Sequence, residues 1–102
     1  MVLLLDNRLY LINLYDYYGD VLTKKQQVYF EYYYFENLSL SEIAENENIS
    51  KAAVFKHIKE AEAKLISLEN VLKDYSKTLR IKEAIKDLDL DIKNKILRIL
   101  EE

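Results

Sequence analysis

The sequence predicts an all-α protein: a helical bundle that contains a helix-turn-helix, a long C-terminal helix and short terminal helices. First, proline is absent and glycine occurs once, at Gly19, so helix-breaking residues are scarce. Second, Ser, Thr and Asp stand where helices are expected to begin. Third, apolar residues recur at steps of three and four along most of the chain. The 102 residues favour a single helical domain over 1–102, with the helix-turn-helix at about 39–64 and a helical extension at about 65–102.

Capping chemistry marks the start of each helix, because a side-chain oxygen can accept a hydrogen bond from an unpaired N–H of the first turn. Thr23 and Ser39 are each followed three positions later by Gln or Glu, which is the spacing of a capping box. Gly19 stands where a C-terminal cap is expected after the first helix. The expected N-terminal caps are Asp6, Thr23, Ser39 and Ser50, which open helices at about 7–18, 24–36, 40–47 and from 51 into the seventies.

The fourth helix carries an apolar stripe with the 3.5-residue repeat of a helix seam. We expect the first half of this seam to pack on the first two helices of the same chain. We expect its second half to contact the C-terminal helices or a second subunit. An interface with a partner helix along the seam is the alternative. The stripe consists of Val54, Ile58, Ala61, Leu65, Leu68, Leu72, Tyr75 and Leu79.

Beyond Thr78 the apolar pattern continues and predicts one or two further amphipathic helices. A break is expected near 87–91, with Asp89 as the cap of the last helix. The apolar positions of this part are Ile81, Ala84, Ile85, Leu88, Ile92, Ile96, Ile99 and Leu100.

Residues 39–58 have the layout of a helix-turn-helix. The first helix offers an apolar residue and a small one, which lets the two helices cross closely. Asn48 falls at the turn, where a positive φ is needed and Asn tolerates it well. The second helix then has a serine cap and two inward-facing apolar residues. The positions that carry this layout are Ile43, Ala44, Asn48, Ile49, Ser50, Val54 and Ile58.

The outward face of that second helix is the candidate nucleic-acid interface, since a helix-turn-helix inserts the N-terminal half of this helix into the major groove. The lysines are expected to contact phosphates, and the residues between them to face the groove. The lone histidine is expected to be partly buried or to contact a phosphate. The alternative is a structural helical corner that binds no nucleic acid. The candidate residues are Lys51, Lys56 and Lys59 for phosphates, Ala52 and Phe55 for the groove, and His57.

These motifs resemble known families. The stretch from Leu38 to Val54 resembles the helix-turn-helix of sigma-factor region four and of the LuxR-type response-regulator domain. A more extensive resemblance, over about residues 8–75, is to the YlxM family of small helix-turn-helix proteins. It implies an all-α fold with a core like that of sigma region four, and a role in or regulation of the signal recognition particle pathway. The segments that carry it are 15–18, 22–26, 32–34, 39–45 and 50–58, with Lys59 and Glu62.

Two sites depart from the pattern of these families. Glu47 stands where such motifs usually carry an apolar residue, which predicts a looser turn. Ala52 and Phe55 stand where sigma-like proteins often place polar base-reading side chains, which argues against sequence-specific readout of DNA.

Charge and composition exclude several classes of protein. The net charge is −3; residues 1–49 carry −5 and residues 50–64 carry +2, a weak basic surplus for a duplex binder. Without cysteine, and with one histidine and one glycine, the chain has no Cys-based nucleophile or zinc site and no glycine-rich phosphate loop. We therefore expect no enzyme activity, no metal and no cofactor. The apolar start, 1–5, is too short for a signal peptide or membrane span, so we expect a cytoplasmic protein without membrane insertion.

Nine tyrosines and three phenylalanines are many for this length, and the run 29–35 wraps around its helix. We expect these aromatic residues to form the core and a homodimer interface, with base stacking on RNA as the alternative.

The sequence as a whole supports two hypotheses for the function. The first is a nucleic-acid-binding regulatory or accessory protein whose partner is DNA. The second is a protein-interaction adaptor whose partner is the protein or RNA of the signal recognition particle.

Overall fold

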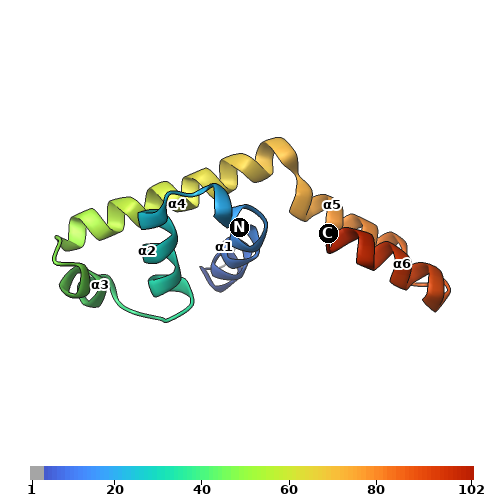
Figure 1. The fold of residues 1–102 in the computed structure, drawn as a ribbon, viewed down its shortest axis with the longest axis horizontal. Helices are drawn as coiled ribbons and strands as arrows, with labels where there is room; N and C mark the ends of the chain where they lie inside the picture. Colours follow the sequence, from blue (N-terminus) through green and yellow to red (C-terminus); the bar gives the residue numbers. More distant parts are fainter. Residues whose placement is uncertain (1–3) are drawn as a thin grey trace.

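The computed structural model describes residues 4–102, with side chains from residue 7 onward. This part of the chain contains helices and no strand, so the expected all-α class is confirmed. Figure 1 shows a long central helix, α4, with α1, α2 and α3 on one side and a helical arm at its end. The elements are α1 (Leu4–Tyr18), the short 3-10 helix η1 (Gly19–Val21), α2 (Lys24–Tyr34), α3 (Leu40–Glu47), α4 (Lys51–Leu72), α5 (Asp74–Ala84) and α6 (Leu90–Leu100).

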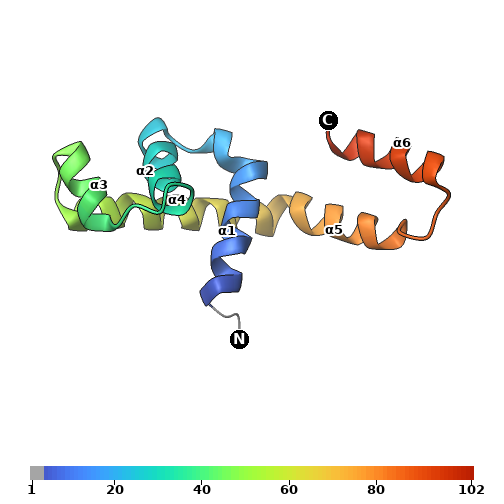
Figure 2. The same ribbon diagram turned by 90° about the horizontal axis from the view of Figure 1, so that it is seen from below.

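Helix α4 organises the core, because α1, α2 and α3 all pack against it (Figure 2). The first half of the expected seam is buried there, so its packing within the chain is confirmed. The buried apolar side chains that surround it come from α1, α2, α3 and the turn before α2. They are Leu11, Leu14, Tyr18, Leu22, Tyr29, Phe30, Tyr34, Ile43 and Ala44, around Val54, Ile58, Ala61 and Leu65 of α4.

Most of the helix starts lie where capping chemistry predicts them. Thr23 and Ser39 both form complete capping boxes, and the Ser50 hydroxyl accepts from the N–H of Ala53 at 3.0 Å. Asp89 caps α6, as expected, by accepting from the N–H of Asp91. These contacts are local, so the sequence alone suffices to find them.

The two expectations for the ends of α1 were wrong. The helix begins at Leu4, so Asp6 lies within its first turn and does not precede it. Gly19 does not have the positive φ of a C-terminal cap; it begins η1 instead. A Cβ atom at this position would lie 3.0 Å from the ring of Tyr15. Gly19 is therefore needed for close packing beneath that ring, and the chain turns through η1.

Helix α2 ends at Tyr34, two residues earlier than expected, because Asn37 adopts a left-handed conformation (φ 57°) that turns the chain toward α3. Arg8 of α1 holds this end in place. Its guanidinium donates to the backbone carbonyls of Tyr33 and Tyr34 and, at 2.8 Å, to Oδ1 of Asn37. A cation at the C-terminus of a helix is favourable, since the last carbonyls of the helix are negative.

The seam does not continue as one helix, because Lys73 takes a left-handed conformation (φ 57°) between α4 and α5. Lys73 provides no side-chain cap for α5. The buried carboxylate of Glu69 caps it instead, accepting from the N–H groups of Tyr75 at 3.1 Å and Ser76 at 3.0 Å. The Tyr18 hydroxyl completes the junction by donating to Glu69 at 2.7 Å and accepting from the N–H of Asp74.

Burial opposes the charge on Glu69, but the hydrogen bonds from Tyr18, Ser76 and Tyr75 outweigh it and lower the pKa of this carboxyl group. Burial and the hydrogen bond to the same carboxylate raise the pKa of Tyr18 to about 12. The carboxylate is therefore charged and the hydroxyl neutral near neutral pH. This junction joins the end of α1 to both α4 and α5.

The second half of the seam was expected to contact the C-terminal helices or a second subunit, and for Tyr75 this was wrong. Its ring packs on α1, with centroids 6.0 Å from Tyr10 and 5.7 Å from Tyr17, and its hydroxyl accepts from Asn13. Leu72 and Leu79 remain about half exposed.

Helices α5 and α6 form an arm that projects from the core (Figures 1 and 2). The molecule measures 54 × 30 × 25 Å, with a radius of gyration of 16.7 Å. A compact domain of this length would have about 13 Å. The break between the two helices, at residues 85–89, begins slightly earlier than the expected 87–91.

Candidate nucleic-acid interface

Helices α3 and α4 form the expected helix-turn-helix. Asn48 has φ 56°, as expected, and its N–H bonds to the carbonyls of Ala44 and Glu45 at the end of α3. The N–H of Ile49 also bonds to Ala44, and its side chain packs against the core. Glu47 is half-buried in this closed turn, so the looser turn that we expected at this residue is not seen.

The N-terminal half of α4 presents an exposed face. Val54 and Ile58 are 0% and 3% exposed and hold the helix on the core. The five residues predicted to point outward are exposed, so the expected outward face is confirmed as geometry. Its exposed members are Lys51, Ala52, Phe55, Lys56 and Lys59.

Lys59 differs from the other two lysines because it has a partner in the chain. Its ammonium group lies 3.1 Å from Oε1 of Glu62 and 5.5 Å from the centre of the Phe55 ring. Glu62 is itself only 8% exposed and accepts a hydrogen bond from the Tyr34 hydroxyl. Among residues 7–102, Lys51 and Lys56 have no carboxylate at ion-pair distance, so these two carry the unpaired positive charge of the face.

His57 is half-buried and faces α2 from α4. Its ring meets Tyr29 edge-on, with centroids 5.2 Å apart. The expectation that it is partly buried is therefore confirmed, and a contact with a phosphate stays a prediction.

Helix α3 is acidic, with three glutamates and no basic residue between Leu40 and Glu47. Glu42 is held as a carboxylate, since the Ser39 N–H donates to it and lowers its pKa. In a helix-turn-helix this first helix crosses the nucleic-acid backbone, where carboxylates repel phosphates. Within the helix-turn-helix, the positive charge therefore lies on α4 and not on α3.

Comparison with known proteins identifies the family. Residues 5–101 match the profile of the UPF0122 family, described as YlxM/p13-like helix-turn-helix proteins. The chain belongs to this family. A UPF0122 protein of Fusobacterium nucleatum is 36% identical over 97% of both chains, and one of Clostridium perfringens is 40% identical over 96% of both. One of Mycoplasma mycoides is 49% identical over 68% of this chain and 61% of its own.

The family is described as one of helix-turn-helix proteins. Within the described residues of this UPF0122 chain, no three His, Cys, Asp or Glu side chains gather as metal ligands would. No described helix combines the length and apolar character needed to cross a bilayer.

Most aromatic residues of this UPF0122 protein belong to the core, as expected. Phe30 is fully buried and stacks on Tyr15, with centroids 4.6 Å apart and planes 7° from parallel. The exposed aromatic side chains are Tyr17, Phe35 and Phe55, and they lie on three different helices or helix ends. They do not form the continuous run of rings that base stacking on RNA would need.

Three tyrosine–glutamate pairs were missed at the sequence level. They join Tyr15 to Glu31, Tyr18 to Glu69 and Tyr34 to Glu62. Burial is the largest cause that raises the pKa of each of these tyrosines, and the hydrogen bond to the glutamate is the next. The pairs span 16, 51 and 28 residues, so no local spacing marks them.

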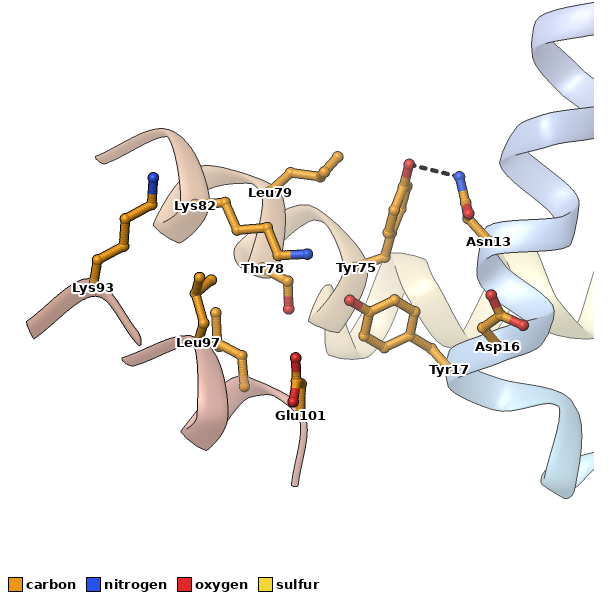
Figure 3. A pocket seen from close by; sticks show the side chains of 11 residues that line it. Asn13, Asp16, Tyr17, Tyr75, Thr78, Leu79, Lys82, Lys93, Leu97 and Glu101 are labelled. Carbon is orange, nitrogen blue, oxygen red and sulfur yellow. Dashed lines mark hydrogen bonds between the residues drawn. The ribbon is translucent and has the colours of Figure 1, made fainter. Parts of the chain in front are cut away.

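A pocket of about 810 Å³ lies between α1 and the arm, away from the helix-turn-helix (Figure 3). Tyr17 and Tyr75 form one side of it, with Asn13 bonded to the Tyr75 hydroxyl, and Leu97 faces them from α6. Lys82, Lys93, Asp16 and Glu101 stand around it with mixed charge. Because basic and acidic side chains both line this pocket, it lacks the uniformly positive charge that would bind a nucleic acid.

Proposed function

We propose that this chain is a cytoplasmic, non-catalytic regulatory or accessory protein that binds nucleic acid through the N-terminal half of α4. The observation that supports this is the exposed face that begins at the Ser50 cap, next to α3 and opposite the buried Val54 and Ile58. Such a face matches the part of a helix-turn-helix that enters the major groove of DNA.

In this proposal Lys51 and Lys56 contact phosphates, and Ala52 and Phe55 lie at the groove. Lys59 contributes only where its pair with Glu62 opens. Phosphate contacts fix position without reading sequence, and the small and apolar groove residues offer few base-specific hydrogen bonds. Binding is therefore expected to be weak, dependent on salt and nearly independent of sequence.

The first test replaces Lys51 and Lys56 with glutamate. Each phosphate contact contributes a slope of about −0.9 to log K against log salt, so the native protein should show about −2, or about −3 if Lys59 joins. Fluorescence anisotropy with a labelled random duplex at low and physiological salt measures this. The double variant, and the triple variant with Lys59→Glu, should lose binding at every salt concentration.

The matched control is Lys24→Glu with Lys25→Glu, two exposed lysines at the start of α2. It makes the same change in net charge outside the proposed face. Equal loss of binding in the control would show that net charge and not this face is responsible. No binding by the native protein at low salt would refute the proposal.

The second test releases Lys59 by Glu62→Gln. Glutamine keeps an acceptor for the Tyr34 hydroxyl but removes the charge that holds the ammonium group. Affinity for the random duplex at low salt should rise about threefold to tenfold, and the salt slope should steepen by about 0.9. Combining the variant with Lys59→Glu should cancel the gain. A gain that persists in this combination would show that Lys59 is not its source.

A second function, the protein-interaction adaptor, is favoured by the acidic α3 and by the charge of −5 over residues 1–49. In this case the helix-turn-helix serves as a scaffold, and the partner is the protein or RNA of the signal recognition particle, as the family resemblance implies. Titrating each purified component separately against the chain distinguishes the two functions. Saturable binding to the protein component that survives the lysine variants, with no duplex binding, would support the adaptor.

A further inference from the structure

The arm formed by α5 and α6 has almost no core of its own. Helix α6 contains no buried residue, and α5 contains one, Thr78; Ile85 at the turn is the only other buried side chain of the arm. Each helix has eleven residues. Isolated helices of this length are marginal in water, and helices are stabilised mainly by packing an apolar face. The arm therefore needs a surface to pack against.

Helix α6 offers an apolar face of the right kind. Ile92, Ile96 and Ile99 are spaced by four and three residues, which places them on one side of the helix. Ile92 is 51% exposed and Ile99 is 64% exposed. Ile81 of α5 and Leu88 of the turn between the two helices also remain exposed. The α6 stripe has the spacing of a helix–helix seam, and of its three residues only Ile96 is half-buried within the chain.

The arm is also electrically polarised along its length. Its root, residues 73–82 of α5 together with residues 96–102 of the returning α6, carries five basic and three acidic residues, a net charge of +2. Its tip, residues 83–95, carries four acidic and three basic residues, a net charge of −1. Two such arms side by side with their tips together would place like charges against each other. With their tips in opposite directions, each acidic tip lies beside a basic root.

We propose that the arm is a homodimerisation element in which two copies pack antiparallel about a two-fold axis. The seams of Ile92, Ile96 and Ile99 meet at the centre, and each tip lies against the root of the other copy. A two-fold interface uses the same surface on both copies, and the reversed charges of root and tip make this surface self-complementary. The helix-turn-helix lies at the opposite end of the long axis and stays accessible (Figure 1).

The first test is the mass in solution by light scattering. At about 100 µM, a concentration at which dimers with a micromolar dissociation constant are formed, the native chain should show twice its mass of 12.2 kDa. Ile92→Lys with Ile99→Lys should halve that mass. Far-ultraviolet circular dichroism should show that helices α1 to α4 remain folded. The control, Leu9→Lys with Val21→Lys, changes two apolar residues that are 59% and 58% exposed outside the arm, and it should remain dimeric.

A native monomer at this concentration would overturn the proposal, as would an unchanged dimer in the α6 variant. A control that became monomeric while the α6 variant stayed dimeric would place the interface near α1 and η1, outside the arm. None of these measurements involves nucleic acid, so the dimer can fail without affecting the proposed function.

The second test is the orientation of the two arms, which the absence of cysteine makes simple. Lys77→Cys places a thiol on the root and Asp87→Cys places one on the tip, both at exposed positions. With a short bis-maleimide, an equal mixture of the two variants should give more cross-linked dimer than either variant alone. A mixture that gives no more product than the separate variants would overturn the antiparallel arrangement.

Discussion

Replacing Glu69 with alanine is expected to lower the free energy of unfolding by about 3 kcal/mol or more, since each buried donor left without an acceptor costs about 1–3 kcal/mol. Glu69 is 5% exposed and accepts from the Tyr18 hydroxyl and from the N–H groups of Tyr75 and Ser76. Its loss would open the start of α5 and leave a buried tyrosine hydroxyl unpaired. Urea unfolding followed by circular dichroism measures the change.

Glu60→Ala is the matched control, because Glu60 lies on the same helix but is exposed. It should change the free energy of unfolding by no more than about 0.5 kcal/mol. Similar losses in the two variants would mean that the buried hydrogen bonds of Glu69 add nothing beyond helix propensity.

The pH dependence gives the same site a second measurement. The pKa of Glu69 is lower in the folded chain than its ordinary value of 4.5, so the folded state favours the charged form. The resulting stability is fully present above pH 4.5 and is lost as the pH falls through the lowered pKa. Glu69→Gln should be less stable than the native chain at neutral pH, and the gap should narrow below pH 4.5. A gap that stays constant down to pH 3 would contradict the role of the carboxylate charge.

Replacing Phe30 with alanine is expected to cost about 3–5 kcal/mol, as removing a buried aromatic ring leaves a cavity. Phe30 is 0% exposed and lies between Tyr15, at 4.6 Å, and Tyr34, at 4.4 Å between ring centroids. These rings connect α1 to α2, so the cavity would loosen the support of the helix-turn-helix. Thermal and urea unfolding measure the loss.

Phe55→Ala serves as the comparison, because this ring is 49% exposed on α4 and should affect stability little. It also removes a groove residue of the proposed interface. If Phe55→Ala were as destabilising as Phe30→Ala, the assignment of the core would be wrong.

The helix-turn-helix could be predicted from the sequence because its determinants are local. The Ser39 capping box, the left-handed Asn48 and the Ser50 cap all act within four residues of their own position. The bounds of α3 and the outward face of α4 therefore followed from the sequence without knowledge of the rest of the chain.

The break at Lys73 could not be predicted, because the chain has no Gly, Asn or Pro there. A lysine with positive φ is uncommon, and it is stabilised here by contacts from elsewhere. The Tyr18 hydroxyl that closes the junction comes from a position 51 residues before Glu69. The apolar repeat continues through Leu72 and Tyr75, so the sequence resembles one long helix although the structure divides it at Lys73.

The position of the candidate nucleic-acid interface was predicted from the sequence, but the number of its unpaired lysines was not. The face of α4 and its three lysines follow from helical periodicity. The pair of Lys59 with Glu62 has a spacing of three residues that is visible in the sequence, and it was overlooked. The Tyr34 hydroxyl that holds Glu62 in place lies 28 residues away and gives no such signal.

The junction at Glu69 also constrains how this chain can evolve. A change at Tyr18 alone leaves the carboxylate with one donor fewer, and a change at Glu69 alone leaves the hydroxyl and two backbone N–H groups without an acceptor. Loss of both would still require a new cap at the start of α5. Substitutions at positions 18 and 69 are therefore expected to become fixed together, although these residues belong to different helices.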